Sequence, residues 1–254
     1  VVFDKVGGAA EVDVVEEAQA YLEAKIASGE FVLPNGVSYA FAGNYENQLR
    51  AQQTLSVVLP LSLFVIFLIL YLQFSSVMTT LIVFSGIAVA WSGGFLVIWL
   101  YSFQGFLDFD VLGANIRELF QVGPVNMSVA IWVGFLALFG VATDNGVVTA
   151  TYLDQTMAKN SAGSSAEIRR LVVQGATRRI RPALMTTATT LLALIPVLTS
   201  TGRGSDIMVP MAIPSFGGML VAIITTLLVP VLYSLVKELS AARGERQLAD
   251  AVAR

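Results

Sequence analysis

The chain has 254 residues, of which 56% are hydrophobic and 13% charged, and its mean hydropathy is +0.73. These values indicate a membrane protein rather than an ordinary soluble domain. The sequence contains no Cys and no His, which excludes disulfides, Cys/His zinc sites, a cysteine nucleophile and a histidine base. The net charge of -3, without a basic stripe with interleaved aromatic residues, argues against a nucleic-acid partner.

Residues 1–54 are predicted to form a small extracytoplasmic α/β piece. Residues 1–3 form a short apolar run typical of a strand, residues 12–26 show helical spacing, and residues 37–42 alternate as a strand does. This order is typical of half of a split α/β subdomain, which is too small to bury a core alone. Because the chain also lacks an initiating Met and a signal-peptide pattern, we expect it to be a segment of a longer protein.

Five apolar segments are long enough to be predicted as transmembrane helices, which makes the fold class a mainly α membrane protein. Ser75 and Ser76 form a very short turn between the first two. Gly86, Gly93 and Gly94 in the second would let neighbouring helices approach closely. The predicted spans are at about 55–74, 77–101, 127–153, 182–199 and 208–236.

Two further helices are predicted to lie on the membrane surface, at about 110–121 and 165–179. In the first, apolar residues such as Ile116, Leu119 and Phe120 recur at helical spacing among charged ones. The second begins with a capping-box pattern that ends at Glu167. Residues 238–254 are expected to form a charged, frayed tail.

The distribution of basic residues predicts the orientation in the membrane. Ten of the fifteen Lys and Arg residues lie in the connection 155–181 or between Lys237 and the C-terminus. Because basic residues accumulate in cytoplasmic loops, we expect these parts inside and the N-terminal part outside. In a Gram-negative bacterium, this describes a multi-pass protein of the inner membrane with a periplasmic N-terminal part and a cytoplasmic C-terminus.

Asp144, followed by Asn145 and Gly146, lies about two-thirds of the way along the third predicted span. An Asp at mid-membrane costs about 2.5–3.5 kcal/mol, so it should face protein or water rather than lipid. One interpretation is a structural carboxylate bonded to Thr or Asn neighbours, or kept wet near the interface. The other is a proton or cation relay, because a carboxyl loads and releases a proton as its surroundings change.

Other polar side chains of the predicted spans also have two interpretations. The hydroxyls of Thr186 and Thr187 either bond back to their own helix or lie across from Asp144 and hold its water. Met208, beside the polar loop 200–207, either packs or offers a soft thioether to a copper or silver ion. The sequence has no Walker-type glycine loop and gives no support for ATP-driven pumping; no cofactor is expected.

Several motifs follow one another in a characteristic order: FAGNYENQLRAQ, GVATDNGVVTATYLD, RRIRPALMTTATT and TGRGSDIMVPMAIPSFGGML. Together they resemble the C-terminal end of resistance-nodulation-division (RND) permeases, and within that superfamily the heavy-metal branch with its copper and silver pumps. The resemblance implies a proton-driven efflux pump of the inner membrane, usually trimeric, that works with a periplasmic adaptor and an outer-membrane channel. It also implies that Asp144 serves the proton relay and that Met208 belongs to the metal path.

Two departures from this family pattern keep other functions open. In the copper and silver pumps a Lys follows the Arg-Pro pair of the fourth span, whereas Ala183 follows Arg181-Pro182 here. Residues 103–125 are an insertion where the family has a short connection. The alternatives are a non-transporting half permease that assists or regulates full pumps, and a relative that exports drugs or lipids.

Overall fold

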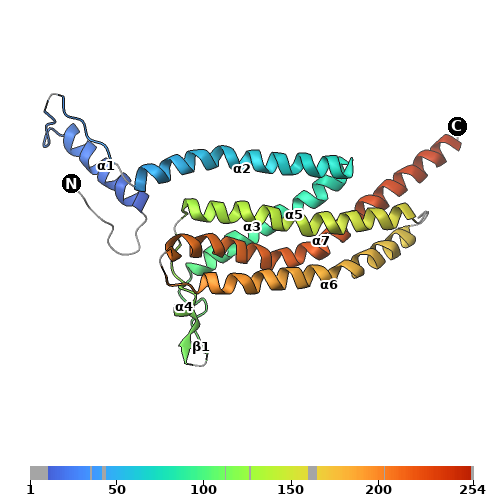
Figure 1. Ribbon diagram of the computed structural model, residues 1–254. Helices are drawn as coiled ribbons and strands as arrows, with labels where there is room; N and C mark the ends of the chain where they lie inside the picture. The colour runs from blue at the N-terminus through green and yellow to red at the C-terminus, as the bar shows by residue number, and fades with distance from the viewer. Residues whose placement is uncertain are drawn as a thin grey trace. The chain divides into compact units, whose positions relative to one another are not determined.

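The computed structural model describes residues 11–34, 36–41, 44–111, 113–125, 127–159, 165–202 and 204–252. The chain divides into two units, Val1–Pro60 and Leu61–Arg254, and each is described by itself. Figure 1 shows that helices make up most of the chain. The protein is therefore mainly α, as predicted.

The first unit contains helix α1 (Glu11–Ala27) and the first part of helix α2 (Asn44–Phe74). Helix α1 confirms the predicted helix. The strand predicted at 37–42 is not shown, because its described residues, 37–41, have no regular secondary structure. The strand predicted at residues 1–3 lies outside the described residues. The predicted α/β piece is therefore not shown.

The second unit is a bundle of long helices. It contains the rest of α2, α3 (Val77–Tyr101), α5 (Val129–Lys159), α6 (Ser165–Leu198) and α7 (Ser205–Val252). In the described part of the chain, five helices are long and apolar enough to cross a membrane. This confirms the five predicted spans, and the helix break at Ser75 and Ser76 separates the first two as expected.

Helix α6 is longer than predicted. It runs without a break through Pro182, so the surface helix at 165–179 and the span at 182–199 are one helix rather than two. A proline removes one backbone hydrogen bond but does not have to end a membrane helix. Helix α7 likewise continues to Val252, so residues 238–252, predicted to fray, are helical.

The predicted surface helix at 110–121 is wrong. Strands β1 (Asp110–Val111) and β2 (Ala114–Asn115) form an antiparallel hairpin, and of the described residues in this range only the single turn of α4 (Ile116–Leu119) is helical. Gly113 has a φ of 85°, which breaks a helix at this point and suits a tight turn. The apolar spacing that suggested a helix is therefore divided between a hairpin and one helical turn.

Helices α3, α5 and α7 pack closely through glycines, and Figure 1 shows α5, α6 and α7 running alongside one another. A Cβ added to Gly93 of α3 would lie 2.7 Å from the carbonyl oxygen of Gly217. One added to Gly134 of α5 would lie 2.2 Å from the carbonyl oxygen of Met211. The predicted close approach is confirmed at Gly93 and Gly94 but not at Gly86, where an added Cβ would lie 3.8 Å from Cγ2 of Thr225. The adjacent core contains Ile131, Phe135 and Leu138.

Candidate functional site

Asp144 lies on a face of α5 that the described chain leaves uncovered. Its neighbours on this face, here named the Asp144 stripe, are all exposed or half-buried. On the other side of the helix, Gly146 packs so closely on α3 that an added Cβ would lie 3.0 Å from Cγ1 of Val83. Helix α5 therefore turns Asp144 away from α3. The Asp144 stripe comprises Ala137, Gly140, Val141, Asp144, Val148 and Thr151.

The Thr or Asn partner required by the structural interpretation of Asp144 is not found among the described residues. Asn145, the adjacent residue, is 5% exposed and lies on the packed side of the helix. Its carbonyl oxygen accepts a hydrogen bond from the Thr149 hydroxyl at 2.8 Å. The structure thus does not bring Asn145 together with the carboxylate of Asp144.

The two threonines of α6 bond to their own helix. The hydroxyl of Thr186 donates to the carbonyl oxygen of Pro182, and that of Thr187 donates to the carbonyl oxygen of Ala183, both at 3.0 Å. Thr187 is buried and Thr186 is exposed. These bonds confirm the back-bonding interpretation for both residues.

Met208 lies in the first turn of α7, where its side chain is exposed and its sulfur approaches Gly204. Across the residues that the structure describes, no group of three or more Asp or Glu side chains is arranged to hold a metal ion. A thioether is a soft ligand that suits copper(I) or silver(I) without carboxylates. The position of Met208 is compatible with such a role, which remains a prediction.

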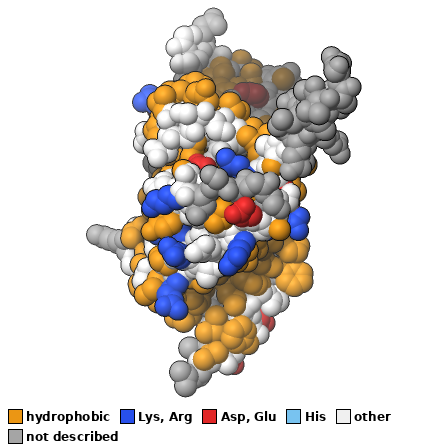
Figure 2. Space-filling view, turned by 90° about the vertical axis from the view of Figure 1, so that its right-hand side faces the viewer, with side chains coloured by type: hydrophobic (Ala, Val, Ile, Leu, Met, Phe, Trp, Pro, Cys, Tyr) orange, Lys and Arg blue, Asp and Glu red, His pale blue; other side chains and the backbone are white. Residues whose placement is uncertain are grey.

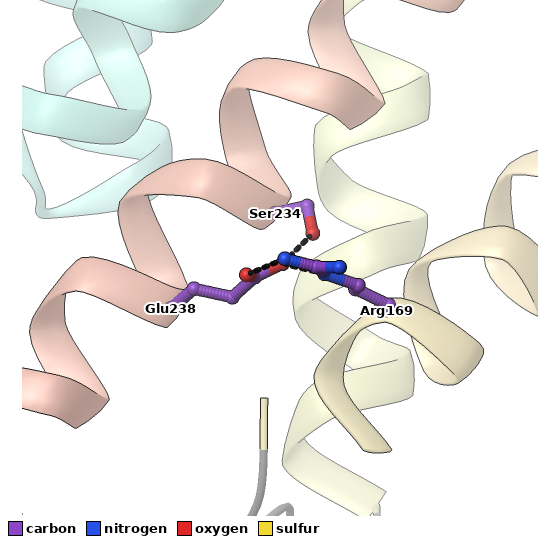
Figure 3. Close-up of polar contacts among 3 residues, drawn as sticks. All are labelled: Arg169, Ser234 and Glu238. Atoms are coloured by element: carbon purple, nitrogen blue, oxygen red, sulfur yellow. Dashed lines mark hydrogen bonds and ion pairs between the residues drawn. The ribbon is translucent and has the colours of Figure 1, made fainter. Parts of the chain in front are cut away.

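Sequence reasoning missed two polar contacts between helices, of which Figure 3 shows the one between Arg169 and Glu238. The guanidinium of Arg169 on α6 donates from Nε and Nη2 to the two carboxylate oxygens of Glu238 on α7, at 2.9 and 2.8 Å. The hydroxyl of Ser234 donates to the same carboxylate at 2.8 Å. The hydroxyl of Tyr233 on α7 donates to Asp154 on α5.

The sequence alone indicates that the two α7 residues of this contact lie close together. Ser234 and Glu238 are four residues apart, which predicts one helical face. Their partners lie on other helices, so the sequence held no signal for the pairing. These contacts join α5, α6 and α7 at the end of the bundle where α5 ends and α6 begins.

The five apolar helices and their close glycine packing define a multi-pass, helical membrane protein. Residues 6–237 match the sequence profile of the AcrB/AcrD/AcrF family. The chain belongs to this family of RND efflux permeases.

Curated relatives place the chain with the heavy-metal branch of the superfamily. It is 32% identical over 231 residues to the cation efflux system protein CusA of Escherichia coli K12, which covers 88% of this chain and 20% of the relative. It is also 32% identical over 222 residues to the cobalt-zinc-cadmium resistance protein CzcA of Cupriavidus metallidurans. That alignment covers 87% of this chain and 18% of the relative. The chain thus spans about a fifth of the length of these relatives.

The fold agrees with the same branch. The crystal structure of a heavy metal efflux pump aligns with a TM-score of 0.62 and 29% sequence identity, covering 91% of this chain and 20% of that one. The likeness therefore extends through nearly the whole bundle described above.

Proposed function

We propose that this chain forms part of a proton-driven RND efflux permease of the inner membrane that exports metal cations, with Asp144 as the acid that binds and releases protons. The observation that carries the proposal is the position of Asp144, exposed on the uncovered face of a membrane span. If lipid covered that face, burying the carboxylate in it would cost about 2.5–3.5 kcal/mol. Another part of the permease, or water, therefore has to cover the Asp144 stripe.

Such an arrangement suits coupling between proton movement and conformation. The carboxylate of Asp144 is not fixed by a hydrogen bond from the described residues, so its protonation depends on what lies against the stripe. Closing that contact favours the neutral acid, and opening it to water or a cation favours the ion. Each charge that crosses 100 mV supplies about 2.3 kcal/mol to drive the change.

Further parts of the proposal follow from the family and the charge distribution. The N-terminal part lies in the periplasm and the C-terminus in the cytoplasm, in line with the basic residues of 155–181. The permease is a homotrimer that works with a periplasmic adaptor and an outer-membrane channel. Met208 contributes its thioether to the path of the metal ion.

Export by variants of the full-length protein tests the role of Asp144. Asp144→Asn keeps the size of the side chain but removes its charge, and we expect it to abolish export of ions from a panel of copper, silver, zinc, cobalt and cadmium. Asp144→Glu should retain part of the activity. Asp154→Asn is the matched control, because it removes the charge of the other acid of α5, which contacts Tyr233. This control should leave export unchanged. Normal export by Asp144→Asn, at equal membrane abundance, would refute the relay.

The second candidate function is a half permease that assists full pumps without transporting. The observation in its favour is Ala183, which is 1% exposed and offers no cation at the position where the copper and silver pumps have Lys. The mass of the native polypeptide and its export activity separate the two. A mass near 27.2 kDa without ion export supports the half permease, whereas export that depends on Asp144 supports the relay.

A further inference from the structure

Helices α6 and α7 enclose a groove of about 810 Å³ at the end of the bundle where α6 begins. Its walls are mostly apolar, with Val173 and Ile180 from α6 and Leu227 and Val231 from α7. Val173, Leu227 and Val231 are 64%, 59% and 61% exposed. Leu227 and Val231 belong to the apolar part of α7, whereas Val173 and Ile180 belong to the basic part of α6 that precedes its apolar stretch. The groove therefore lies at the edge of the bilayer, where the bundle leaves the hydrocarbon core.

The groove has a polar end, formed by the pair Arg169–Glu238 and by Ser234 (Figure 3). The side chain of Arg169 is 70% exposed, and that of Glu238 is 18% exposed. The pair engages Nε and Nη2 of the guanidinium, which leaves Nη1 as the nitrogen that Glu238 does not use. The carboxylate accepts three hydrogen bonds from Arg169 and Ser234, out of about four that its lone pairs allow.

The polar end of the groove displays both signs of charge through the pair Arg169–Glu238, on a face of the molecule that is mostly basic (Figure 2). Figure 2, which faces this end of the molecule, shows Lys and Arg side chains spread over it and a few acidic ones among them. A purely anionic headgroup would contact Arg169 but would also meet the carboxylate of Glu238. A headgroup with one phosphate and one ammonium complements both members of the pair.

We propose that the groove binds one phospholipid of the phosphatidylethanolamine type from the leaflet at this end of the bundle. One acyl chain lies between α6 and α7 along Val173, Ile180 and Val231. The phosphate contacts Arg169, and the primary ammonium donates to Glu238. The groove's volume is within the range of about 300–1,000 Å³ that is usual for small-molecule sites. This site is independent of the proposed role of Asp144.

Lipid retention by the purified native protein tests the proposal. The protein is exchanged into dioleoyl phosphatidylethanolamine, phosphatidylcholine or phosphatidylglycerol, and bound lipid is counted by native mass spectrometry. We expect the ethanolamine lipid to be retained best, because the choline group cannot donate hydrogen bonds and the glycerol group carries no positive charge. Equal retention of all three lipids, or stronger retention of phosphatidylglycerol, would overturn the assignment.

Substitutions at the polar end locate the binding. Arg169→Gln should lower retention of the ethanolamine lipid about tenfold, as expected for the loss of a hydrogen bond to a charged group. Glu238→Gln should shift the preference toward phosphatidylglycerol. Arg170→Gln is the matched control, because Arg170 is adjacent and exposed but does not line the groove. Equal losses in the Arg169 and Arg170 variants would refute a site at the pair.

A groove-filling variant tests the site without disturbing the ion pair. Val173→Trp places a large ring in the groove and should abolish retention, whereas Met185→Trp changes an equally exposed residue of α6 outside the groove and should not. Retained lipid in Val173→Trp would show that the chain lies elsewhere. Asp144→Asn should bind lipid normally, so failure of this proposal and failure of the proton relay are distinguishable.

Discussion

The hydroxyl of Tyr233 on α7 donates a hydrogen bond to the carboxylate of Asp154 on α5, across residues 79 positions apart in the chain. Tyr233 is 1% exposed and belongs to a buried cluster with Leu153, Ile168 and Val172. The contact therefore joins a polar pair to the apolar packing of three helices. It adds a polar link between α5 and α7 to the glycine contacts and apolar packing of the bundle.

Removing this hydroxyl should destabilise the bundle. Tyr233→Phe keeps the ring but leaves the half-buried carboxylate of Asp154 without its donor, which costs about 1–3 kcal/mol. Thermal unfolding of the purified protein in detergent measures the change. Tyr152→Phe, at an exposed position of α5, is the control and should leave the unfolding temperature unchanged. Equal unfolding temperatures for the two variants would contradict a stabilising role for the Tyr233–Asp154 contact.

The glycines of α3 should differ sharply in their tolerance of alanine. A Cβ on Gly93 would lie 2.6 Å from Cβ of Val221, whereas one on Gly86 would lie 3.8 Å from Cγ2 of Thr225. Gly93→Ala should therefore cost about 1–3 kcal/mol of unfolding free energy through overpacking. Gly86→Ala should be neutral or stabilising by up to about 1 kcal/mol, because alanine favours the helix. Denaturant titration in mixed micelles compares them, and equal stability would refute the close α3–α7 contact.

Arg117 should hold the loop that carries the hairpin. Its Nη1 donates to the carbonyl oxygens of Phe103, Gln104 and Phe106 at 3.2, 2.8 and 3.2 Å. Arg117→Ala removes these bonds, so amide hydrogen exchange in residues 103–116 should become faster while exchange in α3 stays the same. Glu118→Gln is the control from the same helical turn. Unchanged exchange in Arg117→Ala would show that the hairpin is held by other contacts.

The Asp144 stripe should be shielded from lipid in the assembled protein. Because the sequence contains no Cys, single cysteines for spin labelling can be introduced without removing native ones. A label at Val148 should show low accessibility to oxygen dissolved in the bilayer, since protein or water has to cover the stripe. A label at Ile224, which is 57% exposed on α7, should show high accessibility. High oxygen accessibility at Val148 would place the stripe in lipid and argue against the proposed relay.

The local pattern of the sequence determined the spans of the bundle. Uninterrupted apolar runs, the Ser75-Ser76 break and the small residues Gly93 and Gly94 each depend on near neighbours, and the structure agrees with all of them. The same local reasoning found Asp144, because an acid within an apolar run is visible without knowledge of the fold. It was wrong at 110–121, where apolar residues at helical spacing form a hairpin around Gly113 instead.

Only the tertiary structure decided which way the side chains point and what they meet. Asp144 and Asn145 are adjacent in sequence, yet one lies on the uncovered face of α5 and the other is buried, because α5 packs on α3 through Gly146. Arg169 and Glu238 are 69 positions apart, and their pairing depends on how α6 and α7 lie together. Periodicity within one helix defines its faces, but the packing of several helices decides which face is covered.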